Sequence, residues 1–149
     1  MRHAIRLSED SVNNDGGPFG AVIARNGDII AEGSNSVTLT HDPTAHAEIN
    51  AIRNATALLG THDLSGCDIY CSCEPCPMCL GAIYWAHLDR VYFANTRKDA
   101  AKIGFDDDFI YSEIPLAVTH RHKPTIPLLR EEALQAFLFW QNKPDKTEY

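Results

Sequence analysis

Three side chains that commonly bind metal ions lie in two short segments about thirty residues apart. His46 lies in TAHAE, and Cys76 and Cys79 lie in EPCPMC. One imidazole and two thiolates are ligands that zinc prefers, and together they leave the fourth corner of a tetrahedron available for water. A chain that uses all three must bring both segments to one point, which restricts the folds open to it.

A carboxylate accompanies this set of ligands. Glu48 lies two residues after His46, close enough to exchange protons with a water molecule on the metal. Cys76 and Cys79 are three residues apart, a spacing that puts both side chains on one face of a helix. A helix start also favours the thiolate form that binds metal. The pattern therefore predicts a catalytic zinc ion with one open position.

Two apolar runs joined by Asn26-Gly27 predict a β-hairpin over residues 19–33, because this dipeptide suits a two-residue turn. Further strands are predicted in CDIYCSC and RVYFAN. Four helices are predicted: up to about Asn14, from Asp42 or Thr44 to Leu59, from Pro75 or Pro77 to about Ala86, and over residues 129–142. Strands that alternate with helices indicate an α/β fold whose sheet has parallel pairs beyond the hairpin.

The apolar spacing also predicts which side of each helix is buried. The inward residues are predicted to be Ile5 and Val12 in the first helix, Ile49, Ile52, Ala55 and Leu59 in the second, and Leu134, Phe137 and Leu138 in the last. Gly60 is expected to end the second helix. The 149 residues fit a single domain, residues 1–149, with a core of substantial size.

Composition narrows the classes of function. The net charge of -7 disfavours a large nucleic-acid interface, since such interfaces neutralise phosphates with lysine and arginine. Five cysteines, four of them crowded into CSCEPCPMC, suit a metal in a reducing cytoplasm better than a disulfide framework. The first ten residues do not resemble a secretion signal, and no apolar run is long enough to span a bilayer. A cytoplasmic protein without membrane partners is expected.

A closed site remains an alternative to the open one. Cys71, Cys73, Cys76 and Cys79 could hold a structural zinc ion or an iron–sulfur cluster. A C-x-x-C pair can also be a redox pair. However, Cys71 and Cys73 share one face of their predicted strand, where cysteines commonly pack as small apolar residues. A closed site would also give no role to His46 and Glu48.

TAHAE together with EPCPMC resembles the cytidine deaminase superfamily, whose H-x-E and P-C-x-x-C signature belongs to zinc nucleobase deaminases. Within it, GGPFGAVI, GAIYW, GFDDDFIY and the terminal tyrosine resemble the guanine deaminases of bacteria. The resemblance implies a three-layer α/β/α fold around a mixed five-stranded sheet, in a homodimer whose carboxy-terminal segments are exchanged. It also implies hydrolytic deamination of guanine to xanthine and ammonia, with one Zn²⁺ per subunit and water as the fourth ligand.

The resemblance further implies roles for individual residues. Asn35 would hydrogen-bond the purine, Phe19 and Trp85 would pack against its ring, and the backbone of Ala47 would contact the base. Asp107 would be a second proton carrier beside Glu48, and Tyr149 would cap the pocket. Other readings are deamination of guanosine, cytosine or a related aminated ring, deamination of adenosine in tRNA, and a non-catalytic zinc scaffold.

Overall fold

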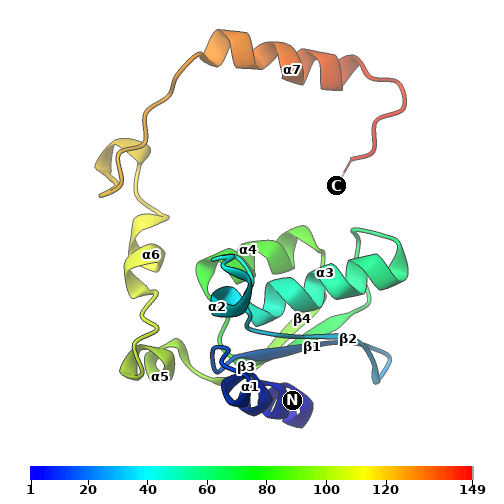
Figure 1. The fold of residues 1–149 in the computed structure, drawn as a ribbon. Coiled ribbons are helices and arrows are strands. Elements are labelled where there is room, and N and C mark those ends of the chain that lie inside the picture. The colour runs from blue at the N-terminus through cyan, green and yellow to red at the C-terminus, as the bar shows by residue number, and fades with distance from the viewer. Residues whose placement is uncertain (149) are drawn as a thin grey trace. The chain divides into compact units, whose positions relative to one another are not determined.

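The computed structural model describes residues 1–148, which form two compact units (Figure 1). The first unit comprises Met1–Asp108, and the second begins at Phe109. The first unit holds the whole β-sheet and all three candidate metal ligands.

The sheet of the first unit has four strands in the order β2-β1-β3-β4. Their bounds are β1 (Gly20–Arg25), β2 (Asp28–Ser34), β3 (Asp68–Cys73) and β4 (Arg90–Asn95). β1 pairs antiparallel with β2 and β3, and β3 pairs parallel with β4. The predicted hairpin is confirmed: Asn26 and Gly27 have φ of 54° and 90°, which are turn values.

The expected fifth strand is absent from the described residues. After β4 the chain turns into α5 (Arg97–Lys102), which Thr96 and Asp99 start with a reciprocal capping box. α6 (Asp108–Glu113) follows. The prediction of five strands is therefore wrong, because capping interactions direct the chain after β4 into helices. β4 is left as an edge strand.

Helices cover both faces of the sheet in the first unit (Figure 1). α1 (Arg2–Asn13) lies on one face, where a Cβ at Gly20 would come within 2.4 Å of the carbonyl oxygen of Ala4. α3 (Ala47–Leu59) lies on the other face, where a Cβ at Gly33 would come within 2.4 Å of the carbonyl oxygen of Ala47. Both helices thus approach the strands backbone to backbone, and only glycine permits this approach.

The close approach of α1 overturns the prediction of its buried face. Ile5 and Val12 are 36% and 52% exposed, whereas Ala4 and Ser11 are buried. A helix backbone that touches the sheet leaves room only for small side chains beneath it. The buried row therefore lies one residue earlier than the apolar spacing predicts.

α3 and α4 begin and end close to their predicted bounds. α3 ends at Gly60 with φ of 66°, as predicted, but its N-cap is His46 rather than Asp42 or Thr44. Its buried residues include Ala47, Glu48 and Ala51 as well as the predicted Ala55, while Ile52 and Leu59 are partly buried against the core. α2 (Val37–Thr40) was not predicted, and α4 (Pro77–Trp85) has proline at its first position, as predicted.

The second unit contains the short 3-10 helix η1 (Val118–His120) and α7 (Arg130–Asn142). Phe137 and Leu138, predicted to face inward, are 73% and 47% exposed, and Leu134 is half-buried. The predicted orientation is wrong for the single chain, because the described residues of this unit form no sheet that could cover α7. Among the described residues, no helix combines the length and apolar character needed to cross a membrane.

Candidate metal centre

The starts of two helices bring the three predicted ligands together. His46 is the N-cap of α3, Cys76 is the N-cap of α4, and Cys79 lies in the first turn of α4. His46 Nδ1 lies 3.6 Å from Cys76 Sγ and 3.5 Å from Cys79 Sγ. Within the described residues, this is the one group of three or more histidine, cysteine or acidic side chains whose ligand atoms are close enough to share an ion.

The separations fit a tetrahedral zinc site. Zinc binds sulfur at about 2.3 Å and imidazole nitrogen at about 2.0–2.1 Å, so the N···S edge of the tetrahedron is about 3.6 Å. The two measured N···S separations, 3.5 and 3.6 Å, agree with this edge. His46, Cys76 and Cys79 can therefore hold zinc without rearrangement and leave the fourth corner for water.

The contact between the two thiols moves their pKa values in opposite directions. Their hydrogen bond lowers the pKa of Cys76 to about 4 and raises the pKa of Cys79. The hydrogen bond between His46 and Cys76 raises the pKa of His46. Bound zinc would favour thiolates and a neutral imidazole, which are the forms that it requires.

Glu48 lies beside the ligands in the first turn of α3. Its side chain is buried, and Cys79 Sγ donates to its Oε2 over 3.4 Å. Burial is the main cause that raises its pKa. The structure thus places a buried carboxyl group with a raised pKa beside the candidate zinc ligands.

The alternative four-cysteine site is not formed. Cys71 and Cys73 are buried on β3 and belong to no ligand cluster in the described part of the chain. The Cys73 thiol donates to the carbonyl oxygen of Thr96 instead, over 3.7 Å. Burial raises the pKa of Cys71 well above its usual range and that of Cys73 to about 11, so both remain neutral thiols.

Two of the predicted base-binding residues lie directly after and before strands of the hairpin. Asn35 is 7% exposed, and its Oδ1 accepts from the backbone of Val37 at 3.3 Å. Its Nδ2 has no hydrogen-bond partner among the described residues. Phe19 makes an edge-to-face contact with Phe105, with 4.9 Å between ring centroids. Phe105 is an aromatic neighbour that the residue pattern did not single out, because a lone loop phenylalanine carries no spacing signal.

The other two predicted base-binding residues that the structure describes differ in burial. Ala47 is buried between His46 and Glu48 at the start of α3, where backbone N–H groups lack helical acceptors. Trp85 is the last residue of α4 and 65% exposed, about 9 Å along the helix axis from Cys79. Tyr149 lies outside the described residues.

Asp107 lies in the loop before α6 and is half-buried. Burial raises its pKa, and the negative charge of Cys76 is the second cause. The loop that carries Asp107 also carries Phe105, whose ring contacts Phe19. These interactions join the Asp107 loop electrostatically and by packing to the region around the ligands.

Comparison with known proteins agrees with this site. Residues 1–95 match the cytidine and deoxycytidylate deaminase zinc-binding region. Guanine deaminase from Bacillus subtilis (strain 168) is 51% identical over 150 residues, which are 100% of this chain and 96% of that protein. The X-ray structure of guanine deaminase from Bacillus subtilis has a TM-score of 0.96 and covers 99% of this chain and 95% of its own.

Two other relatives differ in their named substrates. The structure of guanine deaminase from Nitrosomonas europaea has a TM-score of 0.70 and 33% identity, over 91% of this chain and 70% of its own. The tRNA-specific adenosine deaminase of Buchnera aphidicola subsp. Baizongia pistaciae (strain Bp) is 42% identical over 102 residues, 68% of this chain and 63% of that protein. The family match, the ligand geometry and the shared fold give the same result: this chain belongs to the cytidine and deoxycytidylate deaminase zinc-binding family.

Proposed function

We propose that this chain is a zinc-dependent hydrolase that converts guanine and water into xanthine and ammonia. The assignment of guanine as the substrate rests on the 51% identity to guanine deaminase over the whole chain, since the zinc motifs alone are common to deaminases of several substrates. The assignment of hydrolytic deamination rests on the three-ligand site with Glu48 beside it.

The proposed mechanism assigns proton transfers to two carboxyl groups. Bound zinc would lower the pKa of a coordinated water to about 7. Glu48 would take a proton of this water while the water oxygen forms a bond to C2 of guanine, and it would deliver that proton to a ring nitrogen. It would then protonate the exocyclic amine, which leaves as ammonia when its C2–N bond breaks. Asp107 would act beside the departing amine, since the amino group of guanine lies between two ring nitrogens and more than one proton must move. The raised pKa of each carboxyl group supports this assignment.

The proposed recognition of the base uses one buried amide and an apolar wall. Asn35 would donate from its unpaired Nδ2 to the purine, and Phe19, held edge-on by Phe105, would pack against the ring. The backbone N–H of Ala47, in the first turn of α3, would contact the base between the metal ligand and Glu48. Trp85 and Tyr149 would complete the pocket.

We also infer a homodimer in which the carboxy-terminal segments are exchanged. α7 exposes large apolar side chains, among them Phe137, Phe139 and Trp140, and the first unit exposes Trp85 on α4 and Phe93 on the edge strand β4. Exposed apolar area of this kind marks interaction surfaces. A reducing, cytoplasmic compartment fits the five free cysteines, two of which must remain thiolates to bind zinc.

An ammonia-release assay tests the substrate. Purified zinc-loaded protein is incubated with guanine, guanosine, adenine, cytosine or cytidine, with and without a chelator. The proposal requires release from guanine that the chelator abolishes and added zinc restores. Release from cytidine but not from guanine would overturn the substrate while the zinc chemistry stands. No release from any base would favour a non-catalytic zinc scaffold.

The similarity to tRNA-specific adenosine deaminase makes tRNA the main competing substrate. The net charge of -7 weighs against it, because tRNA binding requires a basic surface. Transfer RNA is therefore included in the same assay, with inosine formation as its readout.

A further inference from the structure

A crossover segment, residues 35–45, connects the end of β2 to His46 and carries Asn35 at its start. The segment thus joins a proposed base-binding residue to a metal ligand. Only α2, four residues long, gives it regular structure. Its two ends must therefore be held by contacts with neighbouring elements.

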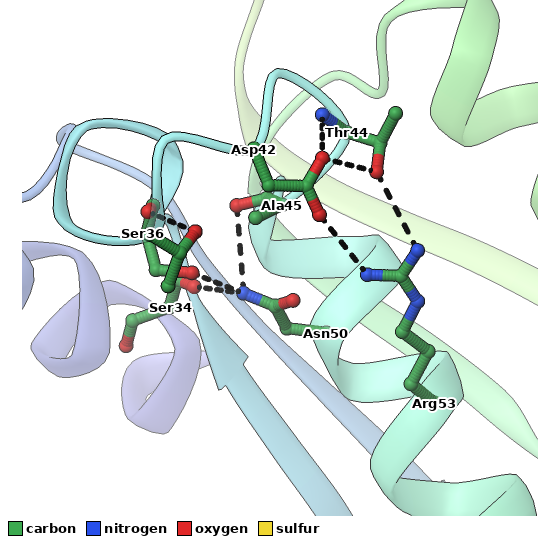
Figure 2. A network of polar contacts seen from close by, with 8 residues as sticks. Ser34, Ser36, Asp42, Thr44, Ala45, Asn50 and Arg53 are labelled. Atoms are coloured by element: carbon green, nitrogen blue, oxygen red, sulfur yellow. Dashed lines mark hydrogen bonds and ion pairs between the residues drawn. The ribbon is translucent and has the colours of Figure 1, made fainter.

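Asn50, half-buried on α3, contacts both ends of this segment (Figure 2). Its Nδ2 lies 2.8 Å from the carbonyl oxygen of Ser34 and 3.0 Å from Ser36 Oγ, on either side of Asn35. The same Nδ2 lies 3.4 Å from the carbonyl oxygen of Ala45, the residue before His46. Figure 2 shows one amide nitrogen facing all three acceptors.

The backbone adds to this contact. Asn50 N donates to the carbonyl oxygen of His46 at 2.9 Å, and Ser36 N donates to the carbonyl oxygen of Ala45 at 3.0 Å. Asn50 therefore bonds two consecutive carbonyl groups at the metal ligand and both neighbours of Asn35. A change at this amide alters the position of both residues together.

A second group in Figure 2 holds residues 42–44 of the segment. Asp42 accepts from the backbone and hydroxyl of Thr44 at 2.8 and 2.7 Å, and Arg53 lies 3.6 Å from Asp42. The Arg53 side chain is 58% exposed, and exposed ion pairs contribute little to stability. The half-buried amide of Asn50 is therefore the stronger of the two attachments.

We propose that Asn50 is a positioning residue that fixes the metal ligand His46 and the base-binding Asn35 relative to each other. The expected loss of zinc affinity does not depend on which substrate the protein uses. The expected rise in KM rests on the proposed function. Polar groups that orient metal ligands typically affect metal affinity about 10- to 100-fold, which sets the expected size.

The same helix offers a matched control. Asn54 lies one turn farther along α3, and its Nδ2 donates to the carbonyl oxygen of Glu32 in β2 at 2.9 Å. Asn54 thus makes an amide-to-strand bond like that of Asn50, but its side chain is exposed and, among the described residues, it forms no hydrogen bond to the crossover segment. Asn50→Ala and Asn54→Ala have the same intrinsic effect on helix propensity, and urea unfolding measures what their different burial contributes to stability.

The experiment measures zinc affinity of the metal-free full-length proteins by competition with a chromophoric chelator, and then KM and kcat with guanine after zinc loading. Asn50→Ala should bind zinc about 10- to 100-fold more weakly and show a raised KM when saturated with zinc. Asn54→Ala should stay within about twofold of the wild type in both quantities. Urea unfolding of the metal-free proteins reports the purely structural cost of each change.

Equal changes of zinc affinity in the two variants, or wild-type affinity in Asn50→Ala, would overturn the proposal. If Asn50→Ala does not fold, Ser36→Ala carries the test, since it removes one of the three acceptors and leaves the amide in place. A zinc affinity reduced about threefold or more in Ser36→Ala supports the proposal, and an unchanged affinity contradicts it. A wild-type protein that binds zinc but does not act on guanine would refute only the proposed substrate.

Discussion

Replacing Gly33 by alanine should damage the metal site through the backbone of α3. A Cβ at Gly33 would lie 2.4 Å from the carbonyl oxygen of Ala47 and 2.5 Å from the backbone nitrogen of Ala51. Both are backbone atoms of one helix, so neither can rotate away. Ordinary contact begins near 3.4 Å, so strand and helix must separate by about 1 Å.

The separation changes the site whichever element moves. β2 continues into Asn35, and His46 is the N-cap of α3, so the distance between the proposed base-binding residue and the candidate metal ligand increases. Overpacking of this kind costs about 1–3 kcal/mol of stability. A displacement of about 1 Å at reacting groups can lower the rate about 100-fold. Without the clash, a change from glycine to alanine in a strand would raise the free energy of unfolding. A lower free energy of unfolding in Gly33→Ala would therefore be evidence for the clash.

Gly20→Ala is the control for this prediction. A Cβ at Gly20 would meet the carbonyl oxygen of Ala4 at 2.4 Å and Leu7 Cβ at 2.7 Å, on the face covered by α1. Both variants should lose similar free energy of unfolding in urea, but only Gly33→Ala should lose zinc affinity, because no zinc ligand lies on β1 or α1. Turnover is not compared in Gly20→Ala, since Gly20 adjoins Phe19. Full kcat and zinc affinity in Gly33→Ala, or an equal loss of zinc affinity in Gly20→Ala, would contradict this prediction.

Three further predictions concern individual side chains. Glu48→Gln should retain one zinc ion per chain by metal analysis but lose turnover by about 100- to 10,000-fold, since it cannot accept a proton; substantial residual activity would remove it from that role. Asp107→Ala should lower kcat by about tenfold or more with unchanged zinc content, and a loss of zinc would instead indicate a structural role. In chelator-treated protein, iodoacetamide should modify Cys76 even at pH 5.5, because its pKa of about 4 keeps it a thiolate above that value, whereas Cys71 and Cys73 should remain unmodified. Added zinc should protect Cys76, as peptide mass spectrometry would show.

The elements of the fold that have strong local signals could be predicted from the sequence. Asn26-Gly27 defined the hairpin turn, Gly60 ended α3, and Pro77 opened α4. The metal ligands were also predictable, because zinc requires few residue types at a characteristic spacing. The structure brings His46, Cys76 and Cys79 together as expected.

Features that depend on tertiary contact were not predictable in this way. The buried face of α1 follows from the close approach at Gly20, which favours Ala4 over Ile5 and leaves no mark in the apolar spacing. The role of Asn50 could not be predicted, because its acceptors are carbonyl groups whose positions depend on the fold. Phe137 and Leu138 of α7 were predicted to face inward but are exposed, since apolar spacing identifies an apolar helix face and not what covers it.

X-ray absorption at the zinc edge of the purified protein distinguishes an open zinc site from a closed one. We expect one zinc ion per chain with two sulfur ligands at about 2.3 Å and two nitrogen or oxygen ligands at about 2.0–2.1 Å, one of them an imidazole. The oxygen ligand should be replaced or shifted when a purine inhibitor is added. Four sulfur ligands without an imidazole, or a protein that binds no zinc, would rule out the open site of His46, Cys76 and Cys79.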